Sequence, residues 1–495
     1  SGDGRLPGAG RLAMAQDALT DTTSEPEAET ELKRSITGRL LYFYVLGDVL
    51  GSGIYVLIGL VAGAVGGAFW LAFAVGVSIA TITGLAYAEL VTKYPKAAGA
   101  ALYVNKAFGN TFLTFLVTVC MLSASFAAAG SLATGFAAYF AQVWAVPPSL
   151  LVAVLFIVLL ALVNFIGITE SVVLNMLMTF VEIAGLVLVL GIGIWFVAGG
   201  DTNFGVLTEF TTEGNEIFAI IAGVALAFFA MTGFENAANV AEETINPSKT
   251  FPRALVGGMV TAGVIYVLVA ITAALTVPID TLAGSNAALL EVVRAGIIPV
   301  PVGVMVILFA VIAMIAITNT TLVAVVTESR ILYGMAREDV VPAVFAKIHP
   351  SRRSPYIALI FAAPVVSGLL FAGAGLQSIG VGLDVIARLA TVTVVFTLFI
   401  YALVIIAALK LRGTHESEDT YRANTPLLYL GILSNAVLLA YVLIDDPSSL
   451  WWCGALLALG FALYAIEYFF GTRDRPPGHE RGDPSELRSA PEKGE

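Results

Sequence analysis

Long runs of apolar residues follow one another along this chain from Leu40 to Phe470. Most of them reach the roughly 20 residues that an α-helix needs to cross about 30 Å of hydrocarbon. They are too long and too uniformly apolar for the alternating strands of a transmembrane barrel. With 58% hydrophobic and 12% charged residues and a mean hydropathy of +0.90, the composition lies outside the range of soluble domains. The sequence therefore predicts an all-α integral membrane protein.

The apolar runs predict about twelve transmembrane helices. Their expected limits are 40–65, 67–92, 110–143, 149–166, 171–199, 216–242, 252–278, 299–336, 356–373, 380–410, 426–443 and 449–470. The two ends of the chain, residues 1–37 and 471–495, are expected to be disordered tails, because they are mostly polar.

Basic residues divide the connecting loops into two sets. With an even number of spans, both termini share one side of the membrane with loops 93–106, 247–253, 337–353 and 410–422. These loops hold Lys93, Lys96, Lys106, Lys249, Arg253, Arg337, Lys347, Arg352, Arg353, Lys410, Arg412 and Arg422, whereas the opposite loops are nearly free of basic residues apart from Arg294. By the positive-inside rule the basic side is the cytoplasm. We therefore expect a multi-pass protein of the cell (plasma) membrane with both termini cytoplasmic.

Cysteine and histidine give no sign of a disulfide framework or a metal site. Cys120 and Cys453 both lie in apolar spans, where they are expected to serve packing. His349, His415 and His479 fall in loops or the tail and are far apart in the sequence. We expect no metal and no cofactor.

Two of the predicted helices are interrupted by residues that weaken a helix. The first carries Gly51-Ser52-Gly53 near its middle, and the sixth is interrupted within FFAMTGFE, residues 228–235, at Thr232 and Gly233. Glycine costs about 1 kcal/mol relative to alanine inside a helix. Interruptions at corresponding places in the two halves are typical of transporters built from inverted repeats, whose binding site lies at the unwound segments.

The spacing of the breaks defines the expected domains. Helices 1–5 and 6–10, residues 38–411, would be two five-helix repeats, and the odd number of spans places the second repeat upside down. Residues 412–470 would add helices 11 and 12. Residues 1–37 and 471–495 would be cytoplasmic tails.

The chemistry of the breaks follows from their orientation. Helix one enters from the cytoplasm, so its second half presents the free amides of Gly51, Ser52, Gly53 and Ile54, which suit a carboxylate. Helix six enters from outside, so its first half ends with carbonyls at 228–230 that suit an ammonium. An α-amino acid carries both groups at short separation. Alternatively, the glycines only allow close helix packing.

Four motifs in this order resemble the amino acid-polyamine-organocation transporters. They are LGDVLGSGIYVLIG (46–59), AYAELVTKYPKAAGA (86–100), FFAMTGFENAANVAEETINPSKTFPRAL (228–255) and SRILYGMAREDVVPAVFAKIHP (329–350). The resemblance runs from about Arg34 to Arg412 and implies a fold of five-plus-five inverted helices, usually with two further helices, and alternating access around one site. It further implies that Gly51, Ser52, Gly53 and Ile54 hold the substrate carboxylate, and that the helix-six loop is formed by Phe229, Ala230, Met231, Thr232 and Gly233. The aromatic lid would be Phe229 or Phe228.

Three acids lie inside predicted spans, where an ionisable residue is costly and is a functional candidate. Asp48 lies one turn before the first break, Glu182 lies about mid-membrane in helix five, and Glu235 follows the second break. We hypothesise that Glu182 or Glu235 carries or senses a coupled proton, with Asp48 a third candidate. Each could instead be a structural acid. A sodium site would need oxygen ligands such as Asn319, Thr320 and Thr321 in helix eight.

Charges at the helix ends have two interpretations. Asp384 and Arg388, four residues apart near the outer end of helix ten, predict an ion pair. At the cytoplasmic ends, the resemblance implies an inner-gate charge network, whereas solvated interfacial charges are the alternative. The residues concerned are Glu89, Lys93, Glu242, Glu243, Arg330 and Arg337.

The apolar, aromatic surroundings of the second break favour a neutral amino acid as substrate. A cationic amino acid or polyamine fits if Glu235 faces the site, although a polyamine has no carboxylate for the first break. No motif of an intramembrane enzyme and no TVGYG-like channel filter is present. We expect a secondary active transporter in the lipid bilayer with an amino acid substrate, protons or sodium as coupling ion, and no nucleic-acid partner. A non-transporting amino acid receptor, the choice among symport, exchange and uniport, and the oligomeric state stay open.

Overall fold

The computed structural model describes residues 36–94, 99–166, 172–200, 202–211, 214–241, 244–337, 340–352, 354–414 and 420–470. The first half holds α2 (Gly38–Leu50), α3 (Gly53–Val65), η1 (Gly67–Phe69), α4 (Trp70–Lys93), α5 (Ala100–Phe108), α6 (Thr111–Ala141), α7 (Ser149–Ile166), α8 (Val172–Ala198) and η2 (Phe204–Thr208). The second half holds α9 (Glu216–Met231), η3 (Phe234–Val240), α10 (Pro247–Thr276), α11 (Ile279–Ala283), α12 (Ala288–Arg294), α13 (Val302–Arg337), η4 (Ala343–Ala346), α14 (Tyr356–Ser378), α15 (Val385–Lys410), α16 (Thr425–Asp445) and α17 (Ser449–Phe470).

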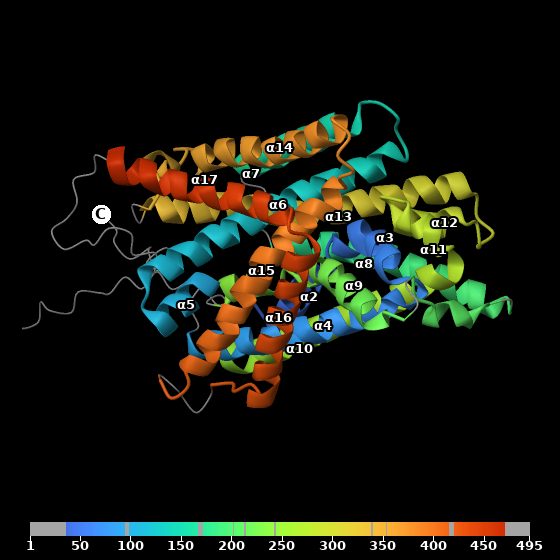
Figure 1. The fold of residues 1–495 in the computed structure, drawn as a ribbon, viewed down its shortest axis with the longest axis horizontal. Coiled ribbons are helices and arrows are strands. Elements are labelled where there is room, and N and C mark those ends of the chain that lie inside the picture. Colours follow the sequence, from blue (N-terminus) through green and yellow to red (C-terminus); the bar gives the residue numbers. More distant parts are fainter. Residues whose placement is uncertain are drawn as a thin grey trace, which may run out of the picture.

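The helices confirm the all-α membrane fold. In the described part, eleven helices are long and apolar enough to cross a membrane, and counting the bent pair α2 and α3 as one further span gives up to twelve. The short helix α5 lies at one end of the bundle, and α11 and α12 lie at the other end (Figure 1). The two ends of the bundle are therefore built differently, as expected for the two faces of a membrane protein.

Helices that correspond in the two predicted repeats pack against each other. Contacts join α3 to α9, α4 to α10, α6 to α13 and α7 to α14. An approximate two-fold axis through the centre of a bundle brings a helix next to its image, so this pairing is what inverted repeats produce. Helix α16 packs on α15, and α17 packs on α15 and α6, so both lie outside this arrangement. The limits of the repeats stay a prediction, and residues 1–35 and 471–495 lie outside the described residues.

Exposed apolar side chains cover the outward faces of several spans. Leu155 on α7, Ile194 on α8 and Trp451 on α17 are all exposed. In water such a surface would promote association, whereas in a bilayer it meets hydrocarbon of similar polarity. The surface therefore agrees with the transmembrane character of the bundle.

Several basic residues lie at helix ends on one side of the bundle. Lys93, Lys106, Arg337 and Lys410 stand in the last turns of α4, α5, α13 and α15. A cation at a helix C-terminus is stabilised by the carbonyl dipoles there. Of the other predicted cytoplasmic residues, Lys96 and Arg353 lie outside the described residues, as does His415.

Candidate functional site

The first break separates α2 from α3 at Gly51 and Ser52. The two helices meet at an angle of 42°. A Cβ atom on Gly51 would lie 2.4 Å from Oγ1 of Thr320, and one on Gly53 would lie 2.4 Å from the Cα atom of Ala230. Both glycines therefore have the close-packing role that the sequence left open, and this packing brings the break against α9 and α13.

The start of α3 keeps backbone donors free. The amide of Ser52 donates to Oγ1 of Thr320 over 3.1 Å. The amides of Gly53 and Ile54 are the first two of the new helix, and they make no hydrogen bond to the described residues. The hydroxyl of Ser52 is also buried without a hydrogen-bond partner among the described residues. This end of α3 is therefore a cluster of unused donors.

The second break lies between α9 and η3. Thr232 is extended, and Gly233 has a φ of +116°, a region that glycine adopts at little cost. A Cβ atom on Gly233 would lie 2.7 Å from the carbonyl oxygen of Asp48. The interruption predicted at Thr232 and Gly233 is thus present, and it packs directly against the end of α2.

Two of the predicted acceptor carbonyls at the end of α9 already accept hydrogen bonds. The carbonyl of Phe229 accepts from the hydroxyl of Thr232 over 2.8 Å, and that of Ala230 accepts from the hydroxyl of Tyr266 over 3.1 Å. The Tyr266 hydroxyl also contacts the carbonyl of Val49 at the end of α2. The amide of Thr232 also donates to the carbonyl of Phe229, over 3.2 Å. A carbonyl oxygen has two lone pairs, so the carbonyl of Ala230 retains capacity for one further donor, whereas that of Phe229 already accepts two. Tyr266, on α10, thereby links the two breaks.

A cavity begins at the two breaks and runs toward the end of the bundle that carries α5. At the breaks it is lined by Asp48, Gly51, Ser52, Gly53, Phe229, Ala230, Thr232, Gly233 and Glu235. Further along it is lined by Tyr87 of α4, Ala100 of α5, Thr327 of α13 and Tyr401 of α15. These residues lie in the halves of their helices that lead to the basic loops, so the cavity faces that side.

Four of the predicted site residues do not line this cavity. Ile54, Phe228 and Met231 are buried in the apolar core, and the ring of Phe228 packs on the ring of Tyr401 with centroids 6.0 Å apart. Glu182 is also fully buried outside the lining. Of the two aromatic lid candidates, only Phe229 therefore borders the cavity.

The three acids Asp48, Glu182 and Glu235 have different partners. Oε2 of Glu235 accepts from the amide of Gly233 over 2.8 Å and from the hydroxyl of Tyr401 over 2.7 Å, so this acid caps the second break. Oε1 of Glu182 accepts from Nδ2 of Asn319 over 2.9 Å. The other oxygen of Glu182 and Oδ2 of Asp48 are buried without a partner among the described residues.

These acids form one electrostatic group. The charge of Asp48 interacts with that of Glu235 on one side and with that of Glu182 on the other. Within the described ranges, none of the three forms an ion pair with a lysine or arginine. Like charges in a site of low dielectric constant repel one another strongly. The group is therefore suited to binding protons or a cation.

The hydroxyl and amide groups considered for sodium are engaged within the protein. Nδ2 of Asn319 donates to Glu182, and Oγ1 of Thr320 accepts from Ser52. The hydroxyl of Thr321 donates to the carbonyl of Ile317 over 2.6 Å, as hydroxyls in helices commonly do. These bonds use the nitrogen of Asn319 and the hydroxyl hydrogen of Thr321, so the oxygens of both residues keep lone pairs for a cation.

The predicted ion pair between Asp384 and Arg388 is wrong. Asp384 precedes α15, and its Oδ1 accepts from the amide of Ala387 over 3.1 Å as a helix N-cap. Arg388 instead pairs with Asp446 in the turn between α16 and α17. Burial alone would raise the pKa of Asp446, but hydrogen bonds from Arg388 and Ser448 outweigh burial and lower that pKa below its ordinary value.

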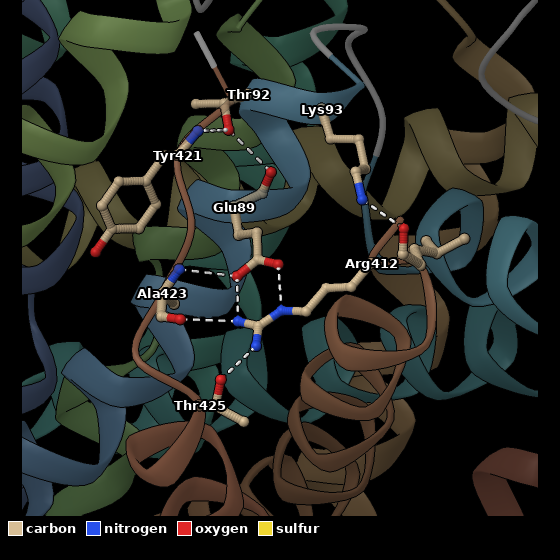
Figure 2. Close-up of polar contacts among 8 residues, drawn as sticks. Glu89, Thr92, Lys93, Arg412, Tyr421, Ala423 and Thr425 are labelled. Atoms are coloured by element: carbon tan, nitrogen blue, oxygen red, sulfur yellow. Dashed lines mark hydrogen bonds and ion pairs between the residues drawn. The ribbon is translucent and has the colours of Figure 1, made fainter. Parts of the chain in front are cut away.

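A second group of charges lies at the end of α4. Glu89 accepts two hydrogen bonds of 2.8 Å from Arg412, and its Oε2 also accepts from the amide of Ala423 (Figure 2). Arg412 donates further to Oγ1 of Thr425, while Nζ of Lys93 contacts the carbonyl of Leu411. Glu89 is only 2% exposed, so the solvated alternative is wrong for this residue.

This charge group ties α4 to the chain between α15 and α16. Arg412 was expected only as a basic loop residue, and its pairing with Glu89 spans a sequence distance that no local pattern reveals. The guanidinium of Arg337 stands over the ring of Tyr333, and Arg330 is exposed. Glu242 and Glu243 lie outside the described residues. A gating role for the group stays a prediction.

A bundle of up to twelve spans among the described residues, with a cavity between two broken helices, has the architecture of a secondary transporter. Residues 39–467 match the amino acid permease family, so the chain belongs to this family of the amino acid-polyamine-organocation superfamily and is a transporter rather than an enzyme.

Similar proteins include cationic amino acid transporter 5 of Arabidopsis thaliana, 27% identical over 90% of this chain and 76% of the relative. The branched-chain amino acid permease BcaP of Bacillus subtilis is 24% identical over 70% of this chain and 76% of the relative. The methylthioribose transporter of Bacillus subtilis is 25% identical over 83% of this chain and 89% of the relative.

Proposed function

We propose that the protein is a proton-coupled secondary active transporter of neutral amino acids that works by alternating access in the cell membrane, with both termini in the cytoplasm. The observation that carries this proposal is the cavity at which the two helix breaks meet. The proposal is supported by unused backbone donors at the start of α3 and backbone acceptors at the end of α9, which meet at these breaks. Membership of the amino acid permease family supports an amino acid as the substrate.

The substrate would be held through its main-chain groups. Its carboxylate would accept from the amides of Gly53 and Ile54, where the dipole of α3 also favours a negative charge. Its ammonium would donate to the carbonyl of Ala230, which lies against Gly53. The side chain would extend along Phe229 into the cavity, whose walls are largely apolar on α6. This environment favours a neutral side chain.

Proton coupling is supported by the acids around the breaks. Asp48 interacts with both Glu182 and Glu235, and none of the three forms an ion pair with a described basic residue. A bound proton removes repulsion within such a group. Because Glu235 caps the second break, a change in its charge would alter the geometry of the site that binds the ammonium.

A cationic amino acid is the second candidate. Asp48 and Glu235 both line the cavity, and one of them would face the side chain of a lysine or arginine. The relative from Arabidopsis thaliana carries the name of a cationic amino acid transporter. Sodium is the second choice of coupling ion, because hydroxyls in a helix more often bond to the preceding turn, as that of Thr321 does.

A thermal-shift screen of the purified protein against all amino acids and polyamines at two pH values tests the substrate class. Neutral amino acids should raise the melting temperature, and the shift should depend on pH. Stabilisation by lysine and arginine alone would favour the second candidate, and stabilisation by no amino acid would contradict both. Counterflow of a labelled amino acid in proteoliposomes then separates a carrier from a receptor that only binds.

A further inference from the structure

Glu328, on α13, is a buried acid outside the site described above. Its side chain is 0% exposed, and neither carboxyl oxygen has a hydrogen-bond partner among the described residues. Glu89 is buried to a similar degree but accepts hydrogen bonds on both oxygens. An ionised carboxylate without partners in a buried site is among the least favourable arrangements in a protein. The state shown here therefore suits the neutral, protonated form of Glu328.

Glu328 lies on α13 next to residues that line the cavity. Val323, Ala324 and Thr327 line the cavity, and Glu328 lies one turn beyond Ala324 on the same side of the helix. It follows Thr320, which contacts the first break, by eight residues, or about 12 Å along the helix axis. Because α13 runs toward the basic loops, Glu328 lies between the breaks and the predicted cytoplasmic surface.

No described ionisable group forms a hydrogen bond or an ion pair with this carboxyl group. The elements packed against α13 are α3, α6, α7, α8, α12, α14 and η4. Their ionisable side chains are Tyr55, Cys120, Tyr139, Glu182, Tyr356 and the Glu291–Arg294 pair on α12. On α13 itself, Arg330, Tyr333 and Arg337 follow Glu328. Neither carboxyl oxygen of Glu328 bonds to any of these groups, so none of them compensates its charge by direct contact.

We propose that Glu328 is a proton-binding residue on the cytoplasmic side of the cavity, through which the coupled proton leaves. This inference rests on the proposed proton coupling. It adds Glu328 to the three acids near the breaks. One proton binds the carboxylate while the cavity has the form seen here. It leaves when movement of α13 or its neighbours opens this face to water, because hydration stabilises the ionised form.

The test compares Glu328→Gln with wild type in proteoliposomes, using labelled L-leucine as the probe. The control variant is Glu467→Gln, because Glu467 on α17 is also buried and its Oε1 also lacks a partner among the described residues. Unlike α13, which carries Glu328, α17 contributes no residue to the lining of the cavity. Wild type and the control should show uptake stimulated by an inward proton gradient. Glu328→Gln should lose this stimulation and retain leucine counterflow.

An infrared spectrum measures the proton itself. Wild type at neutral pH should show the carbonyl band of a protonated carboxylic acid that Glu328→Gln lacks and Glu467→Gln keeps. Absence of this difference, or normal gradient stimulation in Glu328→Gln, would overturn the inference. Wild type without gradient stimulation would instead refute the proposed proton coupling.

Folding of the variants provides the last check. Glu328 makes no hydrogen bond, so Glu328→Gln and Glu328→Met should both fold and bind as wild type does. If both fail to fold, the carboxyl group is structural and the inference is wrong.

Discussion

Adding one methyl group at the first break should disrupt the site. In Gly53→Ala the new Cβ atom would lie 2.4 Å from the Cα atom and 2.8 Å from the Cβ atom of Ala230. Ordinary carbon contacts require about 3.5–4.0 Å, so the two breaks would have to separate by roughly 1 Å or more. Overpacking of this kind costs about 1–3 kcal/mol.

The same shift moves the amide of Gly53 away from the carbonyl of Ala230, which together would hold the two charged groups of the substrate. If the whole strain falls on the bound state, affinity falls about 5-fold to 150-fold, since 1.4 kcal/mol corresponds to a factor of ten. The assay is the dissociation constant of a stabilising amino acid from isothermal titration calorimetry, with a thermal scan of the unliganded protein.

Gly368→Ala is a matched control, because a Cβ atom at Gly368 on α14 would meet nothing within 4 Å. This substitution should stabilise the helix slightly and leave binding unchanged. If Gly53→Ala binds the amino acid as wild type does, the amides at the start of α3 do not hold the substrate in the way proposed.

Three further predictions concern side-chain contacts away from the backbone amides at the start of α3. The pKa of Asp446 is lowered, so its pairing with Arg388 stabilises the protein above the ordinary aspartate pKa. This stability is lost as the pH falls through the lowered pKa. Asp446→Asn should therefore remove this acid sensitivity in thermal scans from pH 6 to pH 3. Glu89→Gln should destabilise the protein by about 3–5 kcal/mol because Arg412 stays buried, and a double variant with Arg412→Leu should regain part of this in chemical denaturation. Tyr266→Phe should cost about 1–3 kcal/mol in the same assay, since two buried carbonyls lose their shared donor.

Features set by local sequence were predicted well. The apolar runs gave the spans, and the glycines at 51, 53 and 233 marked the breaks because their effect acts on the backbone where they stand. The buried position of Glu182 also followed from its place within an apolar run.

Features set by tertiary packing were not predicted. Arg388 pairs with Asp446 in the turn between α16 and α17. It does not pair with Asp384, because Asp384 caps the start of α15. The hydroxyls of Tyr266 and Tyr401 lie in apolar runs with no local sign that they reach the breaks. Phe228 and Phe229 are adjacent, and only the assembled bundle decides which of them borders the cavity.

The sequence alone does not single out Glu328, although this residue lies in the same predicted span as Asn319. Its place near the helix end resembled that of an interfacial charge. The packed structure shows it fully buried without partners, which turns an ordinary acid into a candidate for proton binding.

We propose that this chain moves amino acids through the cavity between its two broken helices by using a proton gradient. Uptake of a labelled neutral amino acid into proteoliposomes, measured with and without an inward proton gradient, tests this proposal. We expect accumulation above the external concentration that a protonophore abolishes and that Gly53→Ala strongly reduces. Equilibration without accumulation under the gradient would contradict the proposed transport.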